Sequence, residues 1–190
     1  MQGLNPILSI VCPEPEAQVV RHVYPLIFTE ENIQKLADKA LQFPTIFGRE
    51  VKDVNEMMSL FFEVTPQGVK FRGPANFFVI DDFIGLFSIT DFTYNYSDAI
   101  GHYTFFDRRH KGRIPLVRAM LKYVFDTYKL NRISVEIPLF TSPEARHFVG
   151  ECGFTLEGKR RKGIKYKNEW YDILLFGILK SEVITGARLD

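Results

Sequence analysis

The sequence has few cysteines and no long apolar run. Its two cysteines, Cys12 and Cys152, are too few for a disulfide framework and lack the spacing of a metal site. The four histidines form no His-x-x-x-His pair, so we expect no structural metal. No run reaches the roughly 18–20 apolar residues of a membrane span, and no basic segment marks a signal peptide. We therefore expect a cytoplasmic protein without membrane contact.

The composition is typical of one globular domain. The chain has 190 residues, of which 46% are hydrophobic and 25% are charged, enough for a single core but not for two ordinary domains. Residues 1–100 hold 7 Lys and Arg against 13 Asp and Glu, a net charge of −6. Residues 101–190 hold 17 against 10, a net charge of +7. This asymmetry predicts that the second half faces an anion, either a nucleotide-like cofactor or a nucleic acid.

Apolar periodicity predicts an α+β fold. Helical spacing favours helices at residues 29–43, with Thr29 as N-cap, 52–63 and 114–128, and Ser142-Pro143 opens a shorter helix that Gly153 ends. Alternating or aromatic-rich runs predict strands at residues 77–80, 83–93, 99–106 and 132–137, and a closing hairpin of 154–166 and 170–179. The apolar runs at residues 7–11 and 23–28 indicate one first strand and an irregular connection. The order predicts a mixed sheet built around a central strand–helix–strand unit.

A basic turn lies between the strand at 99–106 and the helix at 114–128. It reads Arg108-Arg109-His110-Lys111-Gly112-Arg113. The first N–H groups of a helix are free and lie at the positive end of its dipole, so a phosphate can bind there. The alternative is an ordinary solvated basic surface.

These elements and motifs together resemble the GNAT superfamily of acyl-CoA-dependent N-acetyltransferases. The nearest branch resembles the enzymes that acetylate the N-termini of ribosomal proteins. The family's pyrophosphate loop, Arg/Gln-x-x-Gly-x-Gly/Ala, corresponds to residues 109–114, and Gly153-Phe154, Glu157-Gly158 and the closing strand at 169–175 also match. The resemblance covers residues 75–180 well and 1–74 loosely, within one domain of residues 1–190.

The resemblance implies a mixed, mostly antiparallel sheet with splayed central strands flanked by helices, and acetyl-CoA as cosubstrate. The implied cofactor-binding residues are Thr104, Phe105 and Phe106 on the splayed strand, Arg109, His110, Lys111, Gly112, Arg113 and Ile114 in the loop, and Ser142.

Amine acetylation also needs a base that removes a proton from the ammonium. Glu136, on the polar side of its strand, Tyr103 and Ser142 are the candidate catalytic residues, and His102 and Asp107 are further candidates for the base. Each has a structural alternative: a surface strand residue for Glu136, an ordinary strand histidine for His102 and a helix N-cap for Ser142.

The sequence departs from the family pattern at several positions. Ile114 replaces a glycine or alanine, Pro115 removes an N–H from the loop, and Val149 stands where many members carry a tyrosine. Ser142 and Ala145 replace the usual asparagine and serine. We expect an N-acetyltransferase that acts on a primary amine of a protein or peptide. The departures support an alternative, an inactive GNAT-fold protein with a role in assembly or partner binding, of which a viral protein is one example.

The densest run of cations is Lys159-Arg160-Arg161-Lys162, followed by Lys165 and Lys167. It indicates either contact with an acidic or phosphorylated partner or the outward face of a hairpin. The favoured interpretation is the hairpin face, so nucleic acid is not an expected partner. Oligomerisation is left open.

Overall fold

The computed structural model describes residues 5–13, 18–42, 52–71, 76–93, 95, 97–106 and 112–184. In chain order the elements are β1 (Leu8–Pro13), β2 (Gln18–Pro25), α1 (Glu30–Gln42), α2 (Val54–Phe61), β3 (Phe62–Thr65), β4 (Gly68–Phe71), β5 (Asn76–Ile80), β6 (Gly85–Thr93), β7 (Asp98–Phe105), α3 (Arg113–Tyr128), β8 (Arg132–Pro138), α4 (Pro143–Glu151), β9 (Thr155–Tyr166), β10 (Glu169–Leu179) and α5 (Lys180–Ile184).

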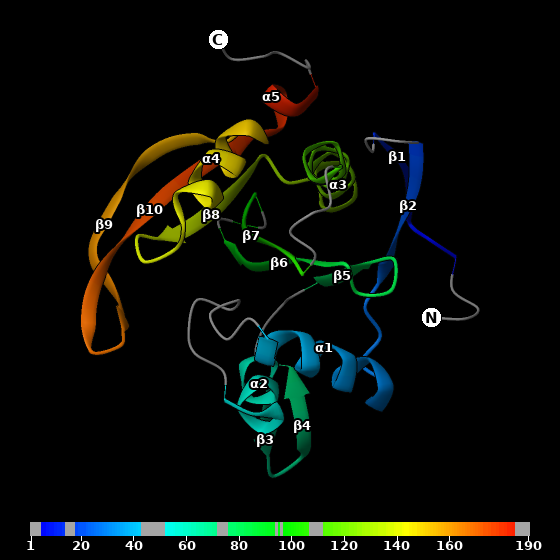
Figure 1. The fold of residues 1–190 in the computed structure, drawn as a ribbon, viewed down its shortest axis with the longest axis vertical. Helices are drawn as coiled ribbons and strands as arrows, with labels where there is room; N and C mark the ends of the chain where they lie inside the picture. Colours follow the sequence, from blue (N-terminus) through cyan, green and yellow to red (C-terminus); the bar gives the residue numbers. More distant parts are fainter. Residues whose placement is uncertain are drawn as a thin grey trace.

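Eight of these strands form one mixed sheet in the order β1-β2-β5-β6-β7-β8-β10-β9, and β3 and β4 form a separate hairpin (Figure 1). Every neighbouring pair in the large sheet is antiparallel except β7 and β8, which are parallel. Parallel neighbours need a long crossover, and α3 supplies it. The predicted α+β fold with a mixed, mostly antiparallel sheet is confirmed.

Helices cover both faces of the sheet. One face packs against α3 and α4, around a core that includes Leu116, Phe125, Ile133 and Val149. We call it the α3 face. The other packs against α1 and α2, around Leu36, Met57, Phe77 and other apolar side chains. We call it the α1 face, and in Figure 1 the two helical layers lie on opposite sides of the sheet.

Helix α3 forms as its sequence pattern predicts. Leu116, Val117, Met120, Leu121, Val124 and Phe125 recur at helical spacing and are buried. The helix ends at Lys129, whose φ of 57° is in the left-handed region that commonly ends helices. This helix therefore connects the parallel strands β7 and β8 and is held by their shared core.

The N-terminal region differs from its prediction in part. Thr29 caps α1 as expected, because its hydroxyl accepts from the backbone N–H of Asn32 at 3.2 Å. The predicted helix at 52–63 was too long at both ends. Asp53 caps α2 by accepting from the N–H of Glu56, and the backbone becomes extended at Phe62. The β3–β4 hairpin that follows was not predicted, because Phe62 continues the apolar spacing of the helix but is extended in the structure and pairs with Phe71.

Among the described residues, no helix is both long and apolar enough to cross a membrane.

Candidate functional site

Strands β7 and β8 separate after a short paired segment. Within the described part of the chain, their pairing runs from Asp98 with Arg132 to Ile100 with Ser134 and stops there. Both strands continue: β7 stays paired with β6 to Phe105, and β8 stays paired with β10 to Pro138. The edges of β7 and β8 that face each other therefore carry backbone N–H and C=O groups with no strand partner. An elongated polar ligand could form hydrogen bonds with these groups. These are the splayed strands that the sequence predicted.

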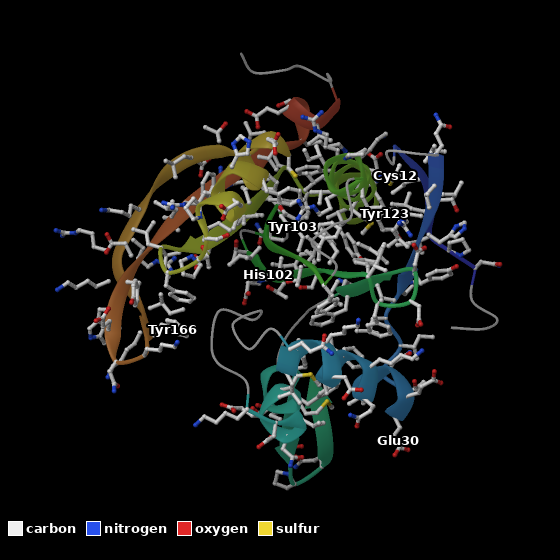
Figure 2. All side chains as sticks on the ribbon, in the orientation of Figure 1. Cys12, Glu30, His102, Tyr103, Tyr123 and Tyr166 are labelled. Atoms are coloured by element: carbon white, nitrogen blue, oxygen red, sulfur yellow. The ribbon has the colours of Figure 1, made fainter. Side chains whose placement is uncertain are left out.

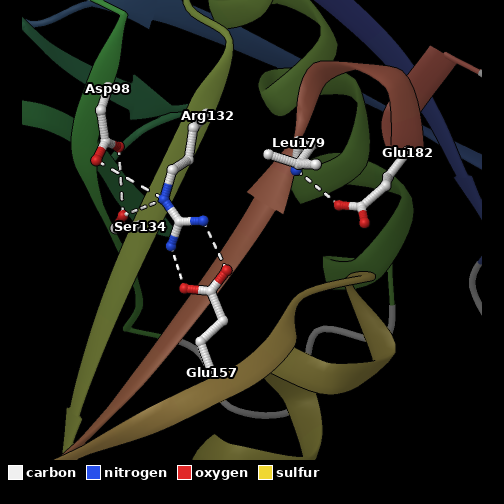
Figure 3. Close-up of polar contacts among 6 residues, drawn as sticks. All are labelled: Asp98, Arg132, Ser134, Glu157, Leu179 and Glu182. Atoms are coloured by element: carbon white, nitrogen blue, oxygen red, sulfur yellow. Dashed lines mark hydrogen bonds and ion pairs between the residues drawn. The ribbon is translucent and has the colours of Figure 1, made fainter. Parts of the chain in front are cut away.

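The paired end of this divergence is held by Arg132. Its guanidinium forms a bidentate ion pair with Glu157 of β9 (Figure 3). Its Nε donates a hydrogen bond to the Ser134 hydroxyl and lies 3.7 Å from a carboxylate oxygen of Asp98 on β7. The pairing lowers the pKa of Glu157 below its ordinary value, mainly through the hydrogen bonds from Arg132. Residues of three strands are thus tied together where the divergence begins.

The candidate catalytic side chains lie on different faces of the sheet. Side chains alternate along a strand, so His102 lies on the α1 face with Ile100, whereas Tyr103 lies on the α3 face and contacts Phe87 and Phe154 (Figure 2). Continuing the register of β7 and β8 by two residues beyond Ile100 and Ser134 would place His102 level with Glu136. Glu136 shares a face with His102, and its charge acts on the imidazole. Tyr103 therefore cannot work beside Glu136 on an amine bound at the α1 face.

His102 has the properties of a base. Desolvation of its ring lowers its pKa below the ordinary value, although the residue as a whole stays exposed, and the charges of Asp91 and Glu136 oppose this shift. Thr90 donates its hydroxyl proton to Asp91 at 2.7 Å. Its 3.3 Å contact with Nε2 of His102 therefore requires that nitrogen to donate, which leaves Nδ1 with a free lone pair. A neutral imidazole held in one tautomer is suited to accept a proton.

Glu136 is held by a partner that the sequence did not suggest. Both its carboxylate oxygens accept from the guanidinium of Arg160 on β9, at 2.8 and 3.2 Å. Bidentate ion pairs of this kind fix the orientation of a carboxylate. The Glu136 side chain is 28% exposed, so solvent and a ligand can still reach it. Glu136 is thus an oriented charge beside His102.

The N-terminus of α3 lies past the open end of β7. Gly112 is its N-cap residue, and no side chain of the residues that the structure describes caps it. The Gly112 carbonyl accepts from the N–H of Leu116 at 3.3 Å and from the thiol of Cys12 on β1 at 3.5 Å. The guanidinium of Arg113 lies 6.0 Å from the ring of Phe105 and 5.3 Å from the ring of Phe148. A cation is thus held beside free helix N–H groups, as an anion site requires.

The structure places the other predicted residues as follows. Thr104 and Phe105 lie on the part of β7 that is paired with β6 but not with β8. The Phe106 side chain is buried in the α1-face core. Ile114 packs against the α3-face core. Ser142 is the N-cap residue of α4, but its hydroxyl makes no capping hydrogen bond. The predicted loop residues Asp107, Arg109, His110 and Lys111 lie outside the described residues.

The cation run lies on the exposed β9–β10 hairpin, as the favoured interpretation expected. Lys159 pairs with Asp172 at 2.9 Å, and Arg160 pairs with Glu136. One residue of this run, Arg160, therefore points back toward the candidate site.

The described residues fit an acyl-CoA ligand. The diverging strand edges suit an elongated amide-containing arm, and the α3 N-terminus with Arg113 suits a diphosphate. The Tyr103 hydroxyl is a buried polar group with no hydrogen-bond partner in the described structure, on the α3 side of the divergence. Such a group is expected where a ligand completes the packing.

Comparison with known proteins agrees with this geometry. A family described as "Acetyltransferase (GNAT) domain" matches residues 69–175. A search of curated proteins found no match.

Solved structures of similar fold include a spermidine N-acetyltransferase from Vibrio cholerae in complex with CoA and spermine. It is 19% identical, with a TM-score of 0.67 over 86% of this chain and 98% of that one. Mutant forms of the spermidine/spermine N-acetyltransferase SpeG from the same organism are 18% identical, with a TM-score of 0.63 over 88% and 99%. At sequence identities this low, the structural similarity shows a shared fold and no more. Because the family match spans more than half of the chain, the protein belongs to the GNAT acetyltransferase superfamily.

Proposed function

We propose that the protein transfers an acetyl group from acetyl-CoA to a primary amine. The observation that carries the proposal is the divergence of β7 and β8, with His102 and Glu136 together on its α1 face. An amine bound on that face would lie next to a base and could reach an acyl donor placed between the two strands.

Acetyl-CoA, when bound, supplies the acetyl group as a thioester. The residues proposed to hold it are the backbone of Thr104, Phe105 and Phe106, the free N–H groups at Gly112, Arg113 and Ile114, and the Arg113 guanidinium. Arg109, His110 and Lys111 remain predicted loop contacts, and Ser142 a predicted contact at the start of α4. The same N–H groups and guanidinium also exclude water from the diphosphate oxygens by replacing it as donors.

His102 is the proposed base. Its lowered pKa keeps the imidazole neutral near pH 7, so Nδ1 can take a proton from the incoming ammonium. The Glu136 carboxylate, held by Arg160, then stabilises the imidazolium that forms. Glu136 is therefore assigned a stabilising role beside the base, and proton acceptance through a water remains its alternative role.

The proposed acceptor is an amine of a protein or peptide. Polyamines are a second candidate, since the similar solved structures are described as spermidine and spermine acetyltransferases. Asp91 is an exposed carboxylate whose charge acts on the His102 ring. It supports the polyamine candidate because it could pair with a second ammonium of the same substrate. The two acceptor classes differ in whether activity depends on this carboxylate.

Thermal unfolding with acetyl-CoA, followed by an acetylation assay, tests the proposal. At about a hundred times its dissociation constant the cofactor should stabilise the fold by about 2.7 kcal/mol. Release of free CoA should then require an added amine, with spermidine and a pool of peptides with free N-termini as the two trial acceptors.

Absence of stabilisation at millimolar acetyl-CoA would overturn the proposal and support the inactive-scaffold alternative. Stabilisation without acetylation of either acceptor would also support that alternative. An Asp91→Asn variant separates the acceptors, because it should weaken turnover of spermidine more than turnover of a peptide.

A further inference from the structure

The hydroxyl of Tyr103 is an unsatisfied polar group in the interior. It is buried, and no described residue offers it a hydrogen bond. The ring is well packed: it stacks on Phe87 with centroids 5.2 Å apart and meets Phe154 at 6.0 Å. A phenylalanine would keep those contacts without an oxygen. A buried hydroxyl without a hydrogen-bond partner is destabilising, so packing alone does not explain a tyrosine here.

The position of Tyr103 on β7 limits what could be its partner. The residue lies beyond Ile100, the last β7 residue paired with β8, and before the end of β7 at Phe105. Its side chain is on the α3 face, away from His102 and Glu136. A group reaching this hydroxyl would therefore enter between the diverging strands, from the side of α3 and α4.

The chemistry of the surroundings makes Tyr103 a donor. Burial raises the pKa of its phenol well above the ordinary value, and burial also raises the pKa of the nearby Cys152 thiol to about 12. Both groups therefore keep their protons at neutral pH. The Tyr103 phenol thus has a proton to donate, and a hydrogen-bond acceptor such as a carbonyl oxygen or a sulfur would satisfy it.

We propose that the Tyr103 hydroxyl donates a hydrogen bond to acyl-CoA bound between β7 and β8, at a carbonyl oxygen or the sulfur of its thioester end. This inference rests on the function proposed above. It assigns Tyr103 to cofactor binding on the α3 face and leaves the base on the α1 face. It also explains why the free protein keeps a buried hydroxyl unpaired.

A Tyr103→Phe variant tests the inference, with Tyr123→Phe as the matched control. Tyr123 lies on α3, where its ring packs edge-on against Phe78 of β5, away from the divergence (Figure 2). Without cofactor, Tyr103→Phe should melt at or above the temperature of the wild type. Its affinity for acetyl-CoA should be roughly 3- to 10-fold weaker, the loss expected for one hydrogen bond, while Tyr123→Phe binds as the wild type does.

The possible failures are distinguishable. If the wild type is not stabilised by acetyl-CoA, the proposed function fails. If the wild type and Tyr103→Phe bind acetyl-CoA equally tightly, the function stands and the inference is wrong. A lower melting temperature of Tyr103→Phe without cofactor would mean that the hydroxyl has an internal partner, which also overturns the inference. Parallel titration with CoA locates the contact: a smaller loss with CoA than with acetyl-CoA supports the acetyl carbonyl, and an equal loss supports the arm or the sulfur.

Discussion

Strand β8 has two edges that differ in how they are used. Its edge toward β10 is paired along its whole length, from Arg132 with Leu179 to Pro138 with Ile173. Its edge toward β7 is paired only as far as Ser134 with Ile100. A sheet interior normally satisfies every backbone group, so the unpaired edge marks where a ligand is expected. The fully paired edge holds β8 in place while the other stays open.

The two edges meet at Arg132. This residue begins β8, contacts Asp98 across the open edge, and pairs with Glu157 on β9 beyond the closed edge (Figure 3). Side-chain ion pairs thus fix the narrow end of the divergence, whereas its wide end is left open for a ligand.

Removing the proposed base on the open edge should have the largest effect. His102→Gln should lower kcat/KM by about 10²- to 10⁴-fold, the usual contribution of a general base, with little change in stability because the residue is exposed. In the wild type, kcat/KM should rise with pH through a midpoint below 6.5, since the pKa of His102 is lowered, and the variant should lose this limb. His147→Gln, on the exposed surface of α4, is the control. Equal rates for His102→Gln and the wild type would exclude His102 as the base.

A charge at the wide end should abolish cofactor binding. Gly112→Asp places a carboxylate at the N-cap of α3, beside the proposed diphosphate site, and the stabilisation of about 2.7 kcal/mol by acetyl-CoA should be lost. The φ of −75° at Gly112 suits any residue, and aspartate is a good N-cap. Gly112→Asn has the same shape without the charge and should keep part of the binding. Identical thermal shifts for the two variants would place the diphosphate elsewhere.

Crowding the closed edge should destabilise the fold. A Cβ at Gly177 would overlap the Arg132 guanidinium and lie 2.6 Å from a Glu157 carboxylate oxygen. Both groups are the ends of flexible, partly exposed side chains that can shift, so Gly177→Ala should cost about 1 kcal/mol, mainly through the disturbed ion pair. Gly158→Ala on β9, where a Cβ meets no atom within 4 Å, should be neutral or slightly stabilising. Chemical denaturation measures both. Equal stability of the two variants would show that the ion pair does not hold this edge.

Loss of the Arg132 ion pair should give the smallest effect, and one that depends on pH. The pKa of Glu157 is lowered in the folded state, so its contribution is present above the unfolded value near 4.5 and is lost as the pH falls through the folded value. Arg132→Gln should therefore cost up to about 1 kcal/mol at pH 7, because the pair is partly exposed, and the difference from the wild type should shrink below pH 4.5. A difference that stays constant with pH would contradict this role for the pair.

The sequence allowed the elements of the second half to be predicted because their signals are local. The spacing of apolar residues in α3, the alternation in β8 and the turn within the β9–β10 hairpin each lie within one short segment. The β3–β4 hairpin was missed because Phe62 also fits the apolar spacing of the preceding helix, whereas in the structure the backbone becomes extended there and pairs with β4. Tyr103 was grouped with Glu136 for a different reason. Each residue has a chemistry that suits catalysis, but only the register of two strands reveals that they lie on opposite faces.

The sequence alone was enough to predict the α+β class and the basic turn that precedes the helix after β7. It also carries motifs similar to those of the acetyltransferases. These follow from periodicity, helix chemistry and short-range spacing. The contacts between side chains follow from the tertiary structure: His102 with Thr90, Glu136 with Arg160, and Arg132 with Glu157. The tertiary structure also brings the Glu136 charge close enough to act on His102. Such contacts join residues on different strands, and the geometry that brings them together comes from strand order and register, which no single segment encodes.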